Sequence, residues 1–90
     1  MKIAIPSYNR PKLLVDKTLK LLLDNGFKLN EIDLFLFDEE QKNEYEIHII
    51  NNYKCSMNII VTDILDLGER LNHILNEYYD EGEEVLLIED

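Results

Sequence analysis

The sequence predicts an α/β domain with four parallel strands in the order 3-2-1-4 and helices on both faces of the sheet. Two observations lead to this prediction. Short apolar runs alternate with amphipathic segments, which is typical of strands joined by right-handed crossover helices. The strand-like runs are almost wholly apolar, as expected for parallel strands buried on both faces. The chain, residues 1–90, has the length of a single domain.

The first strand is predicted over residues 2–5 and is stopped by Pro6. A polar loop leads to Pro11, which suits the first turn of a helix. Asn25-Gly26 supplies the stop of that helix. Its apolar face repeats at helical spacing and comprises Leu14, Thr18, Leu19 and Leu22.

The second strand is predicted over residues 32–37. Asp38 then has the character of a helix N-cap, and the helix is expected to end at Asn51-Asn52. One face of this helix carries Tyr45, His48 and Ile49. The third strand follows over residues 58–61.

A third helix is predicted from Gly68, after a loop over residues 62–67. Its apolar stripe is the clearest in the chain and comprises Leu71, Ile74, Leu75 and Tyr78. A turn over residues 80–83 leads to the fourth strand, residues 85–88, which runs into Glu89-Asp90.

Charge limits the classes of partner. The chain carries 19 acidic and 9 basic residues, a formal net charge of −10. Such a surface repels phosphate backbones and anionic membranes, so we expect no direct nucleic-acid or membrane binding. A nucleotide can still bind locally, and clustered carboxylates favour a divalent cation.

Cysteine usage points to the compartment. Cys55 is the only cysteine, so the chain can form neither an internal disulfide nor a cysteine-based metal site. No signal-peptide pattern and no membrane-spanning run is visible in the sequence. We therefore expect a cytoplasmic protein.

Polar clusters follow every predicted strand. Ligands of parallel sheets bind beyond the carboxyl ends of the strands, so these clusters are the candidate site. They are residues 6–10, 38–39, 62–63 and 89–90. Tyr8 can stack on a base while Asn9 or Arg10 contacts polar groups, or the same loop can be only a capped turn. Asp38 can bind a ribose or a base, or simply cap its helix.

The later clusters also have two interpretations. Arg70 can neutralise a phosphate at a helix N-terminus, or pair with Glu69 or Asp66 on the surface. Glu89 and Asp90 can hold a hard divalent cation, or form a solvated strand end.

Four segments, in order, resemble the GT-A glycosyltransferases, and most closely the glycosyltransferase-2-like and TET-associated groups found in phages and large DNA viruses. Residues 5–11, Ile-Pro-Ser-Tyr-Asn-Arg-Pro, resemble the opening of that family. Residues 34–38 resemble its strand ending in an acid, and residues 68–74 resemble its helix with an R-x-N-like pair. Residues 87–90 resemble the strand leading into a D-x-D-type metal motif.

This resemblance implies a Rossmann-like fold, the N-terminal half of a GT-A domain, that binds a nucleotide-sugar donor with UDP as the expected carrier. The implied base and ribose pocket comprises Pro6, Ser7, Tyr8, Arg10 and Asp38. The positions implied near the diphosphate or sugar are Arg70 and Asn72, and those implied for Mn²⁺ or Mg²⁺ are Glu89 and Asp90. The acceptor site and catalytic base of the family's second half have no match in these residues, so we expect a truncated domain without turnover.

A second hypothesis is a non-catalytic α/β interaction module. Its fourth strand would form an exposed sheet edge that pairs with a copy of itself, as a homodimer, or with a partner chain. A receiver-like phospho-acceptor is disfavoured, because the first strand ends in Pro6-Ser7 where that chemistry needs an acid.

Overall fold

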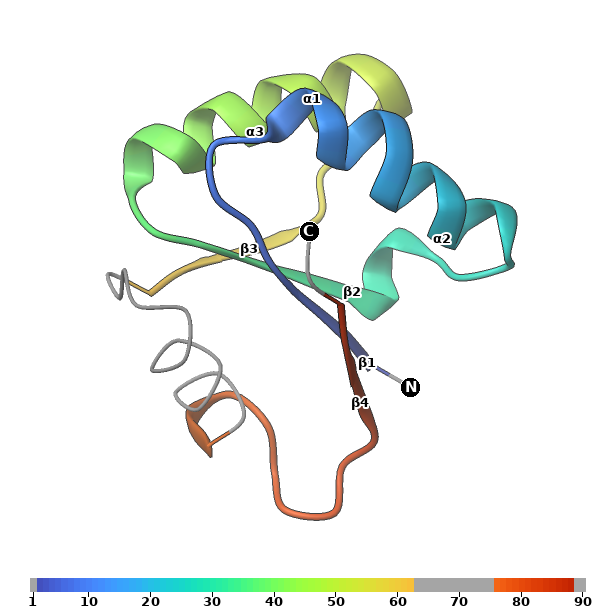
Figure 1. Cartoon of the computed structure of the whole chain (residues 1–90), viewed down its shortest axis with the longest axis vertical. Helices are drawn as coiled ribbons and strands as arrows, with labels where there is room; N and C mark the ends of the chain where they lie inside the picture. Colours follow the sequence, from blue (N-terminus) through green and yellow to red (C-terminus); the bar gives the residue numbers. More distant parts are fainter. Residues whose placement is uncertain (1, 63–75, 89–90) are drawn as a thin grey trace.

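The computed structural model describes residues 2–62 and 76–88. A four-stranded, all-parallel sheet in the order β3-β2-β1-β4 lies at its centre, which confirms the predicted fold class (Figure 1). Helices pack on this sheet, as in Rossmann-like α/β folds. The strands are β1 (Lys2–Pro6), β2 (Ile32–Leu36), β3 (Asn58–Val61) and β4 (Val85–Leu87).

The first predicted helix is present as three consecutive segments, α1 (Pro11–Leu13), η1 (Leu14–Leu19) and α2 (Lys20–Asp24). The middle segment is a π-helix, in which backbone hydrogen bonds join residues five apart. Leu14 and Leu19 are five positions apart and are both fully buried, so the π-helical turn places both side chains in the core. The helix stops at Gly26, whose φ of 94° is accessible to glycine at little cost, as the sequence predicts.

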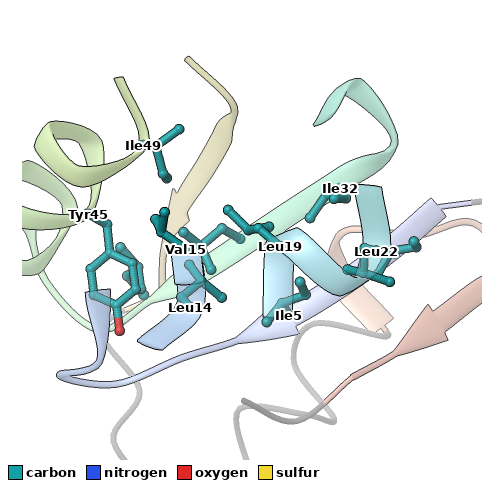
Figure 2. Close-up of a cluster of buried hydrophobic side chains, with 11 residues drawn as sticks. Ile5, Leu14, Val15, Leu19, Leu22, Ile32, Tyr45 and Ile49 are labelled. Carbon is teal, nitrogen blue, oxygen red and sulfur yellow. The ribbon is translucent and has the colours of Figure 1, made fainter. Parts of the chain in front are cut away.

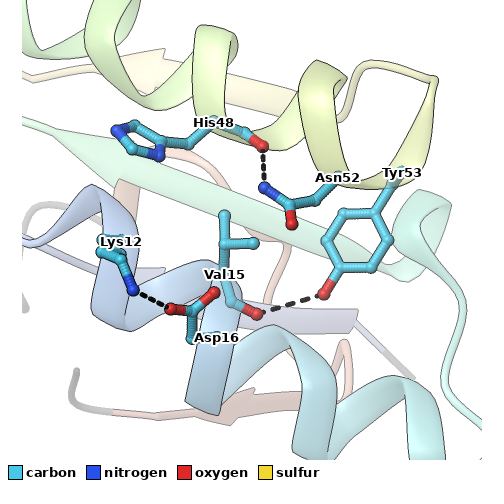
Figure 3. Close-up of polar contacts among 6 residues, drawn as sticks. All are labelled: Lys12, Val15, Asp16, His48, Asn52 and Tyr53. Atoms are coloured by element: carbon cyan, nitrogen blue, oxygen red, sulfur yellow. Dashed lines mark hydrogen bonds and ion pairs between the residues drawn. The ribbon is translucent and has the colours of Figure 1, made fainter.

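The second predicted helix is α3 (Glu39–Tyr53), and Asp38 caps it as expected. It runs past Asn51-Asn52, where the sequence predicts its end, and stops at Lys54 in the left-handed conformation. The reason is Tyr53, which packs against the core and donates its hydroxyl to the Val15 carbonyl at 3.1 Å (Figure 3). A short 3₁₀ helix, η2 (Leu29–Glu31), precedes β2 and was not predicted.

α3 has 15 residues and is the longest helix within the described ranges. Polar and charged side chains occupy much of it, beginning with Glu39 and Glu40. Among residues 2–62 and 76–88, no helix is long and apolar enough to cross a membrane.

The main core lies between the sheet and the helices α1, η1, α2 and α3, which cover one face (Figures 1 and 2). Alternate residues of the strands point into it, because successive strand side chains face opposite sides. Its members are almost all aliphatic, and Tyr45 is its only buried aromatic residue among those described. The buried members are Ile3, Ile5, Leu14, Val15, Leu19, Leu22, Ile32, Leu34, Leu36, Tyr45 and Ile49.

On the opposite face of the sheet, Ala4 and Phe35 are the buried hydrophobic residues of a second cluster within the described ranges. The rings of Tyr78 and Tyr79 meet Phe35 edge-on, with centroid distances of 5.2 and 6.3 Å. Residues 76–77, just before these tyrosines, are helical. The rest of the third predicted helix, residues 68–75, lies outside the described residues.

A buried carboxylate anchors this second face. Asp33 of β2 is only 6% exposed. It accepts hydrogen bonds from the Tyr79 hydroxyl at 2.7 Å and from Asn58 Nδ2 at 2.8 Å, and Lys2 Nζ lies 4.0 Å away. A buried charge is tolerated when it is paired and hydrogen-bonded in this way. Asp33 thereby joins three strands and the segment that covers them.

Replacing Tyr79 with phenylalanine tests this anchor. Burial, and then the hydrogen bond to Asp33, raise the pKa of the Tyr79 hydroxyl above its ordinary value of 10.0. The unfolded chain therefore loses this proton at lower pH than the folded chain, and the free energy of unfolding falls as pH rises above about 10. We expect Tyr79→Phe to lower the free energy of unfolding at pH 7 by about 1–2 kcal/mol. The variant's free energy of unfolding should also fall less steeply between about pH 9.5 and 11.

Urea unfolding followed by circular dichroism measures both effects. Tyr8→Phe is the matched control, because it removes the same hydroxyl from a side chain that is 52% exposed. We expect the control to change the free energy of unfolding by less than about 0.5 kcal/mol. If the free energy of unfolding falls equally steeply with alkaline pH in Tyr79→Phe and in the original chain, the Tyr79–Asp33 hydrogen bond does not anchor this face.

Candidate functional site

The candidate site is the edge of the sheet where the strands end. Backbone hydrogen bonds extend the ladder just past β1, β3 and β4: Ser7 N donates to Phe35 O at 3.0 Å, Thr62 N to Leu36 O at 2.9 Å and Ile88 N to Ala4 O at 3.0 Å. The polar clusters that follow these strands therefore start from one edge, as predicted.

The loop between β1 and α1 forms the centre of this edge. Asn9 has a φ of 55°, a left-handed conformation that asparagine tolerates better than most residues. Arg10 is the N-cap of α1, and its carbonyl accepts the first helical hydrogen bond from Leu14 N at 2.9 Å. Pro11 occupies the first helical position, where its missing N–H costs no helical hydrogen bond, and no described side chain caps this helix.

The hydroxyl of Tyr45, on α3, makes the first connection to the loop. Tyr45 is fully buried, with its ring in the main core (Figure 2). Its hydroxyl oxygen accepts the Arg10 backbone N–H at 2.8 Å and lies 2.7 Å from Ser7 Oγ. Buried tyrosines generally place their hydroxyl on a polar partner. Tyr45 therefore connects both ends of the loop to α3.

The first turn of α3 makes a second connection. Gln41 Oε1 accepts the Asn9 backbone N–H at 2.8 Å. Gln41 N in turn donates to Asp38 Oδ1 at 2.9 Å, the hydrogen bond that caps the helix. The backbone N–H groups of Asn9 and Arg10 thus both have partners on α3, which fixes this part of the loop before any ligand binds.

The predicted base and ribose residues divide into two groups. Pro6 and Ser7 are buried, and the Ser7 hydroxyl is already bonded to Tyr45. Tyr8 and Arg10 are exposed, as is Asn9 between them. The side chains available to a ligand on this loop are therefore the exposed ones.

Of the remaining predicted site residues, the structure describes only Asp38. Asp38 is half-buried, and its cap bond uses one carboxylate oxygen. Arg70, Asn72, Glu89 and Asp90 lie outside the described residues. Within residues 2–62 and 76–88, no group of three or more histidine, cysteine, aspartate or glutamate side chains is arranged to hold a metal ion.

The carboxyl edge of the sheet carries negative charge at the start of α3 and positive charge on the loop after β1. Asp38, Glu39 and Glu40 form a negative first turn on α3, where the helix dipole stabilises them. Lys12 Nζ is bound by Asp16 at 2.7 Å, and this hydrogen bond raises the pKa of Lys12 (Figure 3). Arg10 has no ion-pair partner in the part of the chain that the structure describes. It is therefore the cation at this loop that a ligand can engage.

A shallow pocket of about 330 Å³ lies at the opposite edge, where the strands begin. Its lining is mostly acidic and comprises Lys2, Asn30, Glu31, Glu83 and Glu84. Three carboxylates against one ammonium repel phosphates, so this pocket is a poor nucleotide site.

The sequence did not reveal two of these residues. The sequence places Tyr45 on one face of the second helix, at a position where the glycosyltransferase resemblance has an aromatic residue, but predicts no contact with the loop. Gln41 is predicted only as part of the first helical turn. The signal that could have found Tyr45 is the need of a buried tyrosine hydroxyl for a partner. Its partners lie 35 and 38 positions away in the sequence, so only the fold identifies them.

Comparisons of the chain with protein-family models, with curated proteins and with solved structures each found no match. The chemistry of the site is therefore inferred from its own residues.

Tyr45→Phe tests how the loop is held. The change removes the hydroxyl that bonds to Ser7 and to the Arg10 backbone, while leaving the ring in the core. We expect a loss of about 1–3 kcal/mol in the free energy of unfolding. We also expect faster amide exchange at Arg10, measured by hydrogen-exchange NMR. Tyr53→Phe is the control, because its hydroxyl binds Val15 away from the loop. Equal exchange at Arg10 in both variants would show that Tyr45 does not hold the loop.

Proposed function

We propose that this chain is the donor-binding portion of a metal-dependent, GT-A-type glycosyltransferase, and that its ligand is a nucleotide-sugar. The observation that carries the proposal is the loop after β1. It presents Tyr8 and Arg10 to solvent at the carboxyl edge of a parallel sheet, on a backbone held by Tyr45 and Gln41.

Tyr8 suits a nucleobase. The residue is 52% exposed, although the backbone N–H of Asn9 beside it is bonded to Gln41. Stacking of a base on an exposed aromatic ring contributes about 1–3 kcal/mol. A loop that is ordered in advance avoids much of the entropy cost of binding.

Charge determines how the nucleotide would lie. Asp38 can accept hydrogen bonds from ribose hydroxyls, whereas Glu39 and Glu40 beside it repel phosphates. The diphosphate would therefore extend away from α3, towards β1 and β4. The resemblance assigns Arg70 and Asn72 to the phosphate and sugar, and Glu89 and Asp90 to Mn²⁺ or Mg²⁺. A divalent cation would bridge diphosphate oxygens and offset the negative charge of the chain.

The proposed activity of these 90 residues is donor binding. UDP as the carrier rests on the resemblance to glycosyltransferases alone. A titration with different nucleotides therefore decides the base.

The test is a two-dimensional amide NMR titration with UDP, GDP and CDP, each with and without Mg²⁺. We expect saturable shifts at Tyr8, Arg10 and Asp38 for one of the three nucleotides, and tighter binding with Mg²⁺. Unchanged spectra at millimolar nucleotide would exclude the donor site. The interaction module would then be the better explanation of the fold.

Two variants locate the contacts. We expect Tyr8→Ala to weaken nucleotide binding by about tenfold through lost stacking. Arg10→Ala should weaken it by about fivefold through a lost charge-assisted hydrogen bond. Lys17→Ala is the charge-matched control, because it removes an exposed cation from η1 and should leave the affinity unchanged. If Arg10→Ala and Lys17→Ala weaken binding equally, only general charge is involved.

A further inference from the structure

The outer edge of β3 is not used by the proposed site. The strand order places β3 and β4 at the two ends of the sheet, so each pairs with one neighbour only. Among residues 2–62 and 76–88, no strand pairs with the outer side of β3. An open edge is a template on which another strand can form hydrogen bonds.

The register determines which backbone groups of β3 are open. Leu36 is opposite Val61, and Thr62 N donates inward to Leu36 O at 2.9 Å. Backbone groups alternate in direction along a strand, so those of Ile60 also point inward, to β2. The N–H and C=O groups of Ile59 and Val61 therefore point outward, away from the sheet.

This pattern is complementary to itself. In an antiparallel pair of two β3 strands related by a two-fold axis, Ile59 lies opposite Val61 of the second copy and exchanges two hydrogen bonds with it. The symmetry repeats the exchange, so all the outward groups of Ile59 and Val61 are satisfied. Ile60 lies on the axis, directly opposite Ile60 of the second copy.

Charge favours this edge over β4. Residues 51–62 hold no acidic residue, in a chain with 19 of them. By contrast, Glu83 and Glu84 directly precede β4, and Asp80 and Glu81 lie just before these. Two copies that met at β4 would bring two acidic segments to one interface, whereas the segments that meet at β3 are free of acids from residue 51 to residue 62.

The side chains are also suited to pairing. Ile59, Ile60 and Val61 are β-branched and only half-buried. Cross-strand pairs of such residues stabilise an antiparallel ladder. No charged residue or proline interrupts the strand, which is how many open edges are protected from association.

We propose that this chain forms a two-fold symmetric dimer in which two β3 strands pair antiparallel, joining the two sheets into one. The occupant of the β3 edge is a second copy of the chain. The sequence-based hypothesis assigned self-association to the fourth strand, and the distribution of acids assigns it to the third.

Sedimentation equilibrium measures the dimer dissociation constant, and variants show how far it depends on the outward N–H groups. Val61→Pro removes one outward N–H per copy and leaves the inward hydrogen bonds of β3 in place. Val61→Ala shortens the same side chain but keeps the N–H. We expect Val61→Pro to raise the dimer dissociation constant by at least about tenfold, and Val61→Ala by less than about threefold.

A disulfide tests the register independently of proline. The proposed pair places Ile60 about 4.5 Å, between Cα atoms, from its counterpart, within the range that a disulfide spans. We expect the Cys55→Ser, Ile60→Cys chain to form a covalent dimer under mild oxidation. The original chain is the control, because its Cys55 is exposed. Cys55 lies five positions before Ile60, and the two strands run in opposite directions, so the two Cys55 residues of the proposed dimer lie far apart.

Three outcomes would overturn the proposal. One is an original chain that remains monomeric at millimolar concentration. Another is a dimer that Val61→Pro and Val61→Ala weaken equally, which would indicate side-chain contact without strand pairing. The third is oxidation that links the original chain through Cys55 as fast as it links Ile60→Cys. If Val61→Pro unfolds, as judged by circular dichroism, the disulfide experiment decides.

Discussion

The hydroxyl of Tyr45 connects the parts of this molecule that the sequence leaves far apart. Its ring belongs to the main core, and its oxygen meets Ser7 at the end of β1 and Arg10 at the start of α1. Tyr45 therefore links the path of the loop and the start of the first helix to the position of α3 over the sheet. Because the buried hydroxyl bonds to Ser7 and to the Arg10 backbone, packing of α3 and ordering of the loop are coupled.

Different interactions stabilise the two faces of the sheet. Aliphatic side chains dominate the helix-covered face, where burial of apolar surface is sufficient. On the other face, Ala4 and Phe35 form a second cluster among the described residues, and buried Asp33 adds directional hydrogen bonds to Tyr79 and Asn58. Such bonds specify which segment covers the face, since a buried carboxylate without partners is strongly disfavoured.

Acidic residues are unevenly distributed, and this separates the proposed surfaces. They flank β4 and line the pocket where the strands begin, which discourages anions and a second copy there. The carboxyl edge retains Arg10, and the run from residue 51 to residue 62 is free of acids. Ligand binding at one edge and self-association at another can therefore be tested one at a time.

The sequence by itself determined the first helix with its stop at Gly26 and the Asp38 cap, because these depend on local propensity and on apolar spacing. The strand order was predicted from the fold class, because helical crossovers between successive strands allow few topologies. The sequence also placed Tyr8 and Arg10 on the loop after β1, where parallel sheets bind ligands. Only the tertiary structure decided that Ser7 is buried against Tyr45, that η1 is a π-helix and that α3 extends to Tyr53. It also decided that Asp33 is paired inside the fold. Each of these depends on a partner distant in the sequence, and spacing along one chain carries no information about which distant groups meet.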